Sequence, residues 1–143
     1  MKLEIYEILE KAAAAPTRAE KMDILKKNDS LGLRDVLRAA YDDFIEFNLP
    51  PGAPEYKSNV SKEGLAPTSL LRQTKMMTYF VKKGKGDGLM PVKRERMFLQ
   101  VLEGIHPKDA EILLAVKDKK FAGKYKGITK ALVQEVWPKL IEV

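Results

Sequence analysis

Helix start and stop signals recur along this chain of 143 residues, and the segments between them carry apolar side chains at helical spacing. Residues 2–15 form the first segment, which Pro16 ends because proline cannot continue a helix. A capping box over residues 17–20 (Thr-Arg-Ala-Glu) opens a second helix that runs to about Lys27. Alternation of apolar and polar residues, the signal for strands, hardly appears.

Five further helices follow from the same signals. We expect them over residues 31–46, from Thr68 or Ser69 to about Val81, from Pro91 to Gly104, from Pro107 onward, and from an N-cap at Thr129 to Trp137. The sequence therefore predicts an all-α fold, a compact bundle of about seven short helices that occupies residues 1–143 as a single domain.

Helical spacing also predicts which side chains face the core. Ala19 would lie inward on the second helix, and Phe44 would lie inward near the end of the third. The sequence offers no partner set for the acidic residues Asp109 and Glu111, so we expect both on a solvated helix face. The lone histidine, His106, precedes a helix start and is expected to be a cap or a surface residue.

Two loops interrupt the helical pattern. Residues 48–67 begin with a proline-rich stretch that cannot be helical, and a loop of this length is often functional. It could instead be a spacer that lies over the helices, which is the interpretation we favour given its modest charge. The second loop, residues 82–90, is rich in glycine and lysine.

Composition excludes several kinds of chemistry. With no cysteine and one histidine, the chain cannot form disulfides, cysteine-ligated zinc sites, iron–sulfur clusters or multi-histidine metal sites. We expect no metal site and no cofactor. No apolar run approaches the roughly 18–20 residues of a membrane span, and the first residues alternate charged with apolar side chains, unlike a signal peptide. The expected location is a reducing cytoplasm.

The basic residues are concentrated in the second half of the chain. The formal net charge of +6 combines a slightly acidic half, residues 1–71, with a strongly basic one, residues 72–143. This asymmetry favours a polyanionic partner, and the alternative is a lysine-rich face that is merely solvated.

Residues 85–88 (Lys-Gly-Asp-Gly) match the short core of the motif in which DNA and RNA ligases form a nucleotidyl-lysine. The basic residue expected two places after the second glycine is replaced by Met90. The ligase lysine also belongs to a β-rich domain of roughly 200 residues, which does not fit beside the helices predicted here. We therefore expect a solvated loop and a protein that is not an enzyme.

The lysines of residues 117–130 surround two glycines just before a predicted helix N-terminus, where backbone N–H groups favour an anion. The pattern indicates a hold on the phosphate backbone of DNA in the manner of a helix-hairpin-helix. The candidate DNA-binding residues in this segment are Lys119, Lys120, Lys124, Lys126, Thr129 and Lys130. A second cluster comprises Lys82, Lys83 and Lys85.

Both ends of the sequence resemble the N-terminal helical DNA-binding domain of the ATP-dependent DNA ligases of T-even-like phages. The likeness rests on residues 5–10 (IYEILE), 21–28 (KMDILKKN), 37–41 (LRAAY), 127–130 (GITK) and 136–141 (VWPKLI). In those ligases the domain grips duplex DNA through the backbone and minor groove beside a nick. The compact turn of the family is lengthened here over residues 123–129, and the catalytic domains that follow in the ligases are absent.

The resemblance implies a small standalone phage protein that binds duplex DNA through its backbone, without catalysis and without strong sequence preference. It would act in the host cytoplasm, with phage or host replication or transcription proteins as further candidate partners. The alternative is a helical protein–protein adaptor, such as a virion component or a factor that targets a host polymerase or nuclease. The two hypotheses differ in whether the two lysine clusters lie on one face.

Overall fold

A computed structural model describes residues 3–61 and 65–141 of the chain and confirms the all-α fold. The helices of these residues are α1 (Ile5–Ala14), α2 (Arg18–Lys27), α3 (Leu31–Tyr41), α4 (Leu70–Gln73), α5 (Pro91–Gly104), α6 (Pro107–Lys117), α7 (Phe121–Lys124) and α8 (Lys130–Val136). Two 3₁₀ helices, η1 (Thr74–Tyr79) and η2 (Lys85–Gly88), lie between α4 and α5. Phe47 and Val81 form an isolated antiparallel bridge, and the described residues contain no strand.

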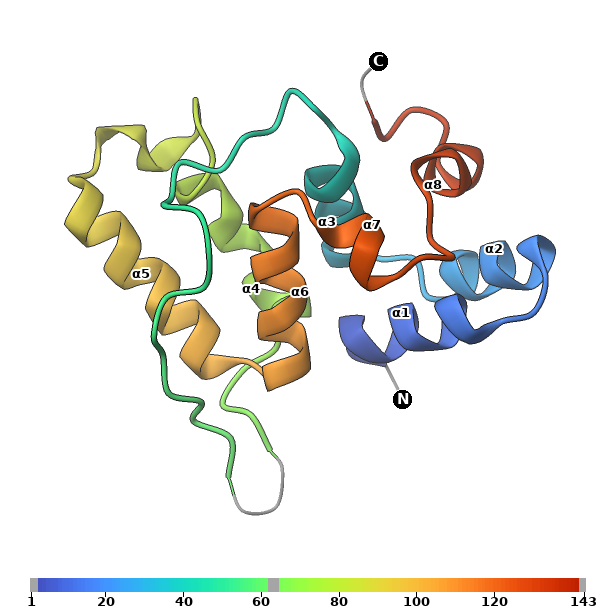
Figure 1. Ribbon diagram of the computed structural model, residues 1–143, viewed down its shortest axis with the longest axis horizontal. Coiled ribbons are helices and arrows are strands. Elements are labelled where there is room, and N and C mark those ends of the chain that lie inside the picture. Colours follow the sequence, from blue (N-terminus) through green and yellow to red (C-terminus); the bar gives the residue numbers. More distant parts are fainter. Residues whose placement is uncertain (1–2, 62–64, 142–143) are drawn as a thin grey trace.

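Helix α6 occupies the centre of the bundle, where it contacts α1, α3, α5 and α7 (Figure 1). Helices α1, α2 and α8 lie on one side of it, whereas α5 and the two 3₁₀ helices lie on the other. Large buried side chains from both sides meet in one continuous core, which includes Ile5, Leu9, Leu37, Phe80, Leu102, Ile112, Leu113 and Phe121. None of the helices in the described part of the chain has the length and apolar character to span a membrane.

Most predicted helix starts are confirmed by their caps. The hydroxyl groups of Thr17, Ser30 and Thr129 each accept a hydrogen bond from a backbone N–H of the first helical turn. Pro91 and Pro107 each begin a helix, where a missing N–H costs nothing.

Two inward positions were predicted wrongly. The third helix ends at Tyr41 rather than residue 46, because the carboxylate of Asp42 accepts a hydrogen bond from the backbone N–H of Phe44 and turns the chain. Phe44 consequently projects into solvent with 73% of its surface exposed. Ala19 is also exposed, since Leu25 is the residue that α2 buries.

The predicted continuous helix to Val81 is also wrong, since the chain tightens into η1 after only four α-helical residues. The following loop packs back against η1 so closely that it needs glycine. A Cβ atom on Gly84 would lie 2.1 Å from the carbonyl oxygen of Thr78, and one on Gly86 would lie 1.8 Å from that of Tyr79. Gly84 and Gly86 therefore have a packing role, because a side chain at either position would collide with the backbone of η1.

Candidate nucleic-acid interface

The Glu46 carboxylate lies between the two lysine clusters that the sequence singled out. Its Oε2 atom is 2.9 Å from the Nζ atom of Lys82. The hydrogen bond and charge of Lys82 lower the pKa of Glu46, and the charges of Lys119 and Lys83 act in the same direction. Lysines from both clusters therefore lie near one exposed carboxylate, since Lys119 and Lys120 line the same shallow depression as Glu46.

Lys119 is directed at the protein rather than at solvent. Its Nζ atom donates hydrogen bonds to the carbonyl oxygens of Ala39, at 2.6 Å, and Asp42, at 3.1 Å. These are carbonyl groups at the C-terminal end of α3, where a cation is favourable. Burial lowers the pKa of Lys119, while the neighbouring Asp43, Asp42 and Glu46 carboxylates raise it. Lys119 therefore caps α3.

Three other predicted site residues also have internal partners. The Nζ atom of Lys124 lies 2.9 Å from Oε2 of Glu111 on α6. The hydroxyl group of Thr129 caps α8, as described above. Lys130 pairs loosely with Asp43, at 3.9 Å.

Four of the predicted lysines have no hydrogen-bond or ion-pair partner for their side chains among the described residues. Among the described residues no ion pair or hydrogen bond engages the ammonium groups of Lys83, Lys85, Lys120 and Lys126, and all four residues are exposed. They do not form one group. The segment after α7 runs towards α1 and α2 (Figure 1), and Gly127 there approaches the side chain of Lys21. The segment that contains Lys126 therefore runs away from the loop of residues 82–90 (Figure 1).

Two buried cations that the sequence analysis missed fix the position of the proline-rich loop. The guanidinium group of Arg94 donates from Nε to the carbonyl oxygen of Asn48, at 2.8 Å. Its Nη1 atom donates to the carbonyl oxygens of Gly86, at 3.1 Å, and Leu89, at 3.2 Å. The Nζ atom of Lys117 donates to the carbonyl oxygen of Pro50, at 2.8 Å. No sequence signal distinguishes these two cations from the exposed ones around them.

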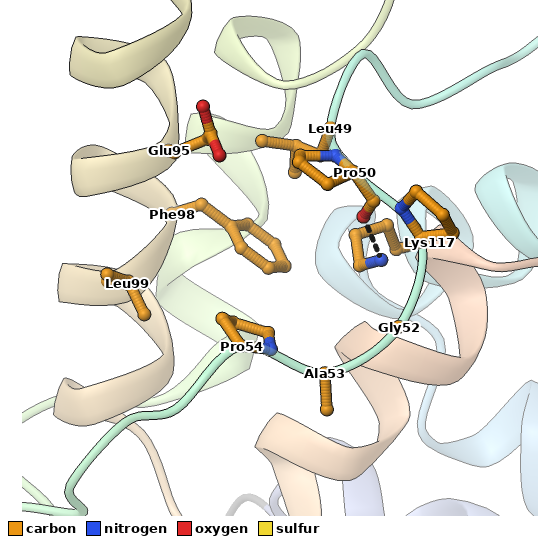
Figure 2. A pocket seen from close by; sticks show the side chains of 10 residues that line it. Leu49, Pro50, Gly52, Ala53, Pro54, Glu95, Phe98, Leu99 and Lys117 are labelled. Carbon is orange, nitrogen blue, oxygen red and sulfur yellow. Dashed lines mark hydrogen bonds between the residues drawn. The ribbon is translucent and has the colours of Figure 1, made fainter.

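The proline-rich loop crosses α5 and covers Phe98, leaving a small apolar crevice of about 190 Å³ (Figure 2). Pro54 and Leu49 lie on either side of the Phe98 ring, and the Lys117 amine points to the Pro50 carbonyl. The described part of this loop therefore lies over the helices, as the spacer interpretation expects.

The N-terminal end of α6 holds a buried carboxyl group, which corrects the prediction of a solvated pair. Asp109 is fully buried, whereas Glu111 is exposed. One Asp109 oxygen accepts a hydrogen bond from the backbone N–H of Tyr6, at 3.0 Å, and the other has no partner among the described atoms. Burial raises the pKa of Asp109 to about 7, and the Glu4 carboxylate contributes in the same direction.

His106 is confirmed as a helix cap, because its Nδ1 atom accepts a hydrogen bond from the backbone N–H of Lys108, at 3.1 Å. Its ring stacks on Tyr6, with 4.4 Å between the ring centroids. The described residues contain no group of three or more histidine, aspartate or glutamate side chains placed to hold a metal ion.

These observations define an all-α protein whose outward-facing lysines form a divided basic surface. The chain belongs to a family of unknown function, DUF6433, whose profile matches residues 8–123. No curated protein matches the chain.

Proposed function

We propose that this protein binds duplex DNA through the phosphate backbone, without catalysis and without strong sequence preference. The observation that carries the proposal is that Glu46 pairs with Lys82 of one cluster and lines the same depression as Lys119 and Lys120 of the other. A duplex presents phosphates along both strands, and cations from two separate loops of the protein can contact both of them.

The lysines of the two loops whose ammonium groups have no internal partner among the described residues are the best candidates for phosphate contacts. Lys83 and Lys85 extend from one loop, and Lys120 extends from the other. Lys82 is paired with Glu46, but both side chains are more than half exposed. An exposed pair of this kind contributes little to stability, so a phosphate group can replace the carboxylate.

The resemblance to the DNA-binding domain of phage ligases supports the same function. It leads us to propose an accessory protein of phage type that acts on DNA in the cytoplasm of a host cell. Lys119 and Thr129 then serve mainly to hold the interface in shape, because each makes hydrogen bonds within the protein. Lys124 is paired with the exposed Glu111 carboxylate.

The test is a gel-retardation experiment with intact and nicked duplexes over a series of salt concentrations. Each phosphate contact releases condensed counterions, so the logarithm of affinity should fall linearly with the logarithm of salt concentration. The triple variant Lys83→Glu/Lys85→Glu/Lys120→Glu should reduce the steepness of this slope by about 2 to 3 and weaken all sequences alike.

The matched control reverses Lys11, Lys26 and Lys27, which are exposed residues of α1 and α2. This control changes the net charge by the same amount and should leave the slope nearly unchanged. Circular dichroism establishes that both variants fold. Failure of the unmodified protein to retain any duplex at low salt would contradict the proposal and favour the adaptor hypothesis. Equal loss of binding in both variants would mean that only the overall charge matters.

A further inference from the structure

Two large apolar side chains project into solvent where α5 begins. Met90 is 75% exposed and Val92 is 65% exposed, and Pro91 lies between them. Helix α5 lies at the outer edge of the bundle (Figure 1), so no described element covers this end of it. Scattered exposed apolar residues are ordinary, but adjacent ones at the tip of a helix form a single projecting apolar point.

This apolar tip is held rigidly. The Arg94 side chain of α5 reaches back to the carbonyl oxygens of Gly86 and Leu89, which fixes η2 against the first turn of the helix. Arg94 is itself buried and also bonds to Asn48. The tip therefore has a defined position relative to the loop that carries Lys83 and Lys85.

Basic residues flank the tip in the sequence. Residues 82–96 contain six lysines and arginines against two acidic residues. Outside the buried Arg94 and the paired Lys82, the described side chains of Lys83, Lys85, Lys93 and Arg96 have no carboxylate partner. Exposed apolar side chains flanked by unpaired cations fit an occupant that is negatively charged outside and apolar inside.

We propose that Met90 and Val92 form a wedge that enters the minor groove of duplex DNA and bends it, while the surrounding cations contact the phosphates. This inference rests on the DNA-binding function proposed above and adds a specific mode of contact. Stacked bases lie between two rows of phosphates, and minor-groove proteins commonly insert one or two apolar side chains between base pairs.

The size of the apolar surface favours DNA over other partners. A stable protein interface buries about 800 Å² on each partner, and attachment to a membrane surface uses the apolar face of a whole helix. Two side chains at one helix tip supply much less than either. Insertion at a single base step requires no more apolar surface than this.

The experiment uses the double variant Met90→Ala/Val92→Ala in the full chain, with duplex DNA that carries a fluorophore at each end. Both residues are exposed, so the fold should persist. The unmodified protein should shorten the end-to-end distance of the DNA. The double variant should bind about tenfold more weakly and lose the bend, while the salt slope stays the same because no phosphate contact has been removed. The matched control is Leu31→Ala/Phe44→Ala, which removes two other exposed apolar side chains.

The outcomes distinguish failure of the wedge from failure of the DNA-binding function. If the double variant binds and bends DNA as the unmodified protein does, the wedge is wrong and the backbone-binding function stands. If the unmodified protein binds no duplex, both proposals fail. If the variant keeps its affinity for DNA but loses binding to vesicles containing phosphatidylserine, the tip recognises a lipid surface and the wedge is again wrong.

Discussion

The two ends of α6 each carry a buried charged group, and they compensate it in different ways. At the N-terminal end, Asp109 has one oxygen bonded to the Tyr6 N–H and one without a partner among the described atoms. At the C-terminal end, the Lys117 amine meets both the Pro50 carbonyl and the Asp118 carboxylate, at 2.8 Å and 2.6 Å. The charged form of Asp109 is therefore unfavourable in the folded protein, whereas the charge of Lys117 holds the proline-rich loop in place.

The comparison also explains why a lysine-rich stretch is a poor guide to a binding site. Lys117 and Lys119 turn inward to backbone carbonyl groups, whereas Lys120, next in the chain, points outward. A lysine has a long flexible stem, so its ammonium group can serve the fold or a partner from the same stretch of sequence. Four predictions test how much each of these charged groups contributes to stability.

The largest effect concerns Asp109. Its pKa is about 7 in the folded state against 3.8 as the ordinary value. Between pH 3.8 and about pH 7 the folded protein keeps a proton that the unfolded chain releases. The free energy of unfolding is therefore greatest below pH 3.8 and falls as the pH rises to about 7. The loss should reach about 4 kcal/mol.

The variant Asp109→Asn should abolish this part of the pH dependence. Above pH 7 it should unfold at a higher urea concentration than the unmodified protein, measured by urea denaturation from about pH 4 to pH 8. Identical pH profiles for the two proteins would contradict the prediction.

The second effect concerns the opposite end of the helix. Lys117→Met keeps the aliphatic stem but removes the amine that donates to the Pro50 carbonyl and to one oxygen of the Asp118 carboxylate. The free energy of unfolding should fall by about 2–3 kcal/mol, because hydrogen bonds to charged groups are the stronger ones. Denaturant midpoints provide the measurement, and hydrogen exchange at Gly52, whose N–H bonds to Asp118, should become faster. An unchanged midpoint would mean that the loop is held without Lys117.

The third effect compares neighbours in the chain. Lys119→Met removes two hydrogen bonds to the end of α3 and should cost about 1–2 kcal/mol. Lys120→Met should change stability by less than about 0.5 kcal/mol, since its side chain has no internal partner. Thermal unfolding of the two variants side by side distinguishes a capping lysine from a free one. Equal melting temperatures for the two variants would mean that Lys119 does not stabilise the end of α3.

The smallest effect belongs to the ion pair between Lys124 and Glu111. The Glu111 side chain is 60% exposed, so solvent screens the pair. Lys124→Met should lower the free energy of unfolding by at most about 0.5 kcal/mol, and 1 M salt should remove even that difference. A loss comparable with that of Lys117→Met would show that Lys124 also has a structural role.

Local signals in the sequence predicted the helices well where capping and periodicity act within a few residues. They predicted the starts at Thr17, Ser30, Pro91 and Pro107 because the capping atoms are close in sequence. They failed at Phe44 because the apolar spacing favoured a longer helix, whereas the Asp42 carboxylate stops it with a local turn. They failed at Asp109 because its hydrogen-bond partner, the N–H of Tyr6, lies 103 residues earlier.

The candidate site could be predicted only as a set of residue types. The sequence located both lysine clusters, but it could not show that Glu46 lies between them or that Lys119 faces α3. Nor could it distinguish the buried Arg94 from the exposed Lys93 and Arg96 on the same helix by charge. Residues far apart in the chain set the direction of each cation.

The sequence by itself therefore determined the fold class, most of the helix starts and the uneven distribution of charge, because these depend on composition and on contacts within one or two helical turns. Only the tertiary structure decided which charges are buried, which lysines remain free and which apolar residues project from the surface. The physical reason is that burial and hydrogen bonding of a long side chain depend on what the rest of the chain brings beside it, at separations of 80 residues for Lys119 and Ala39 and 67 for Lys117 and Pro50.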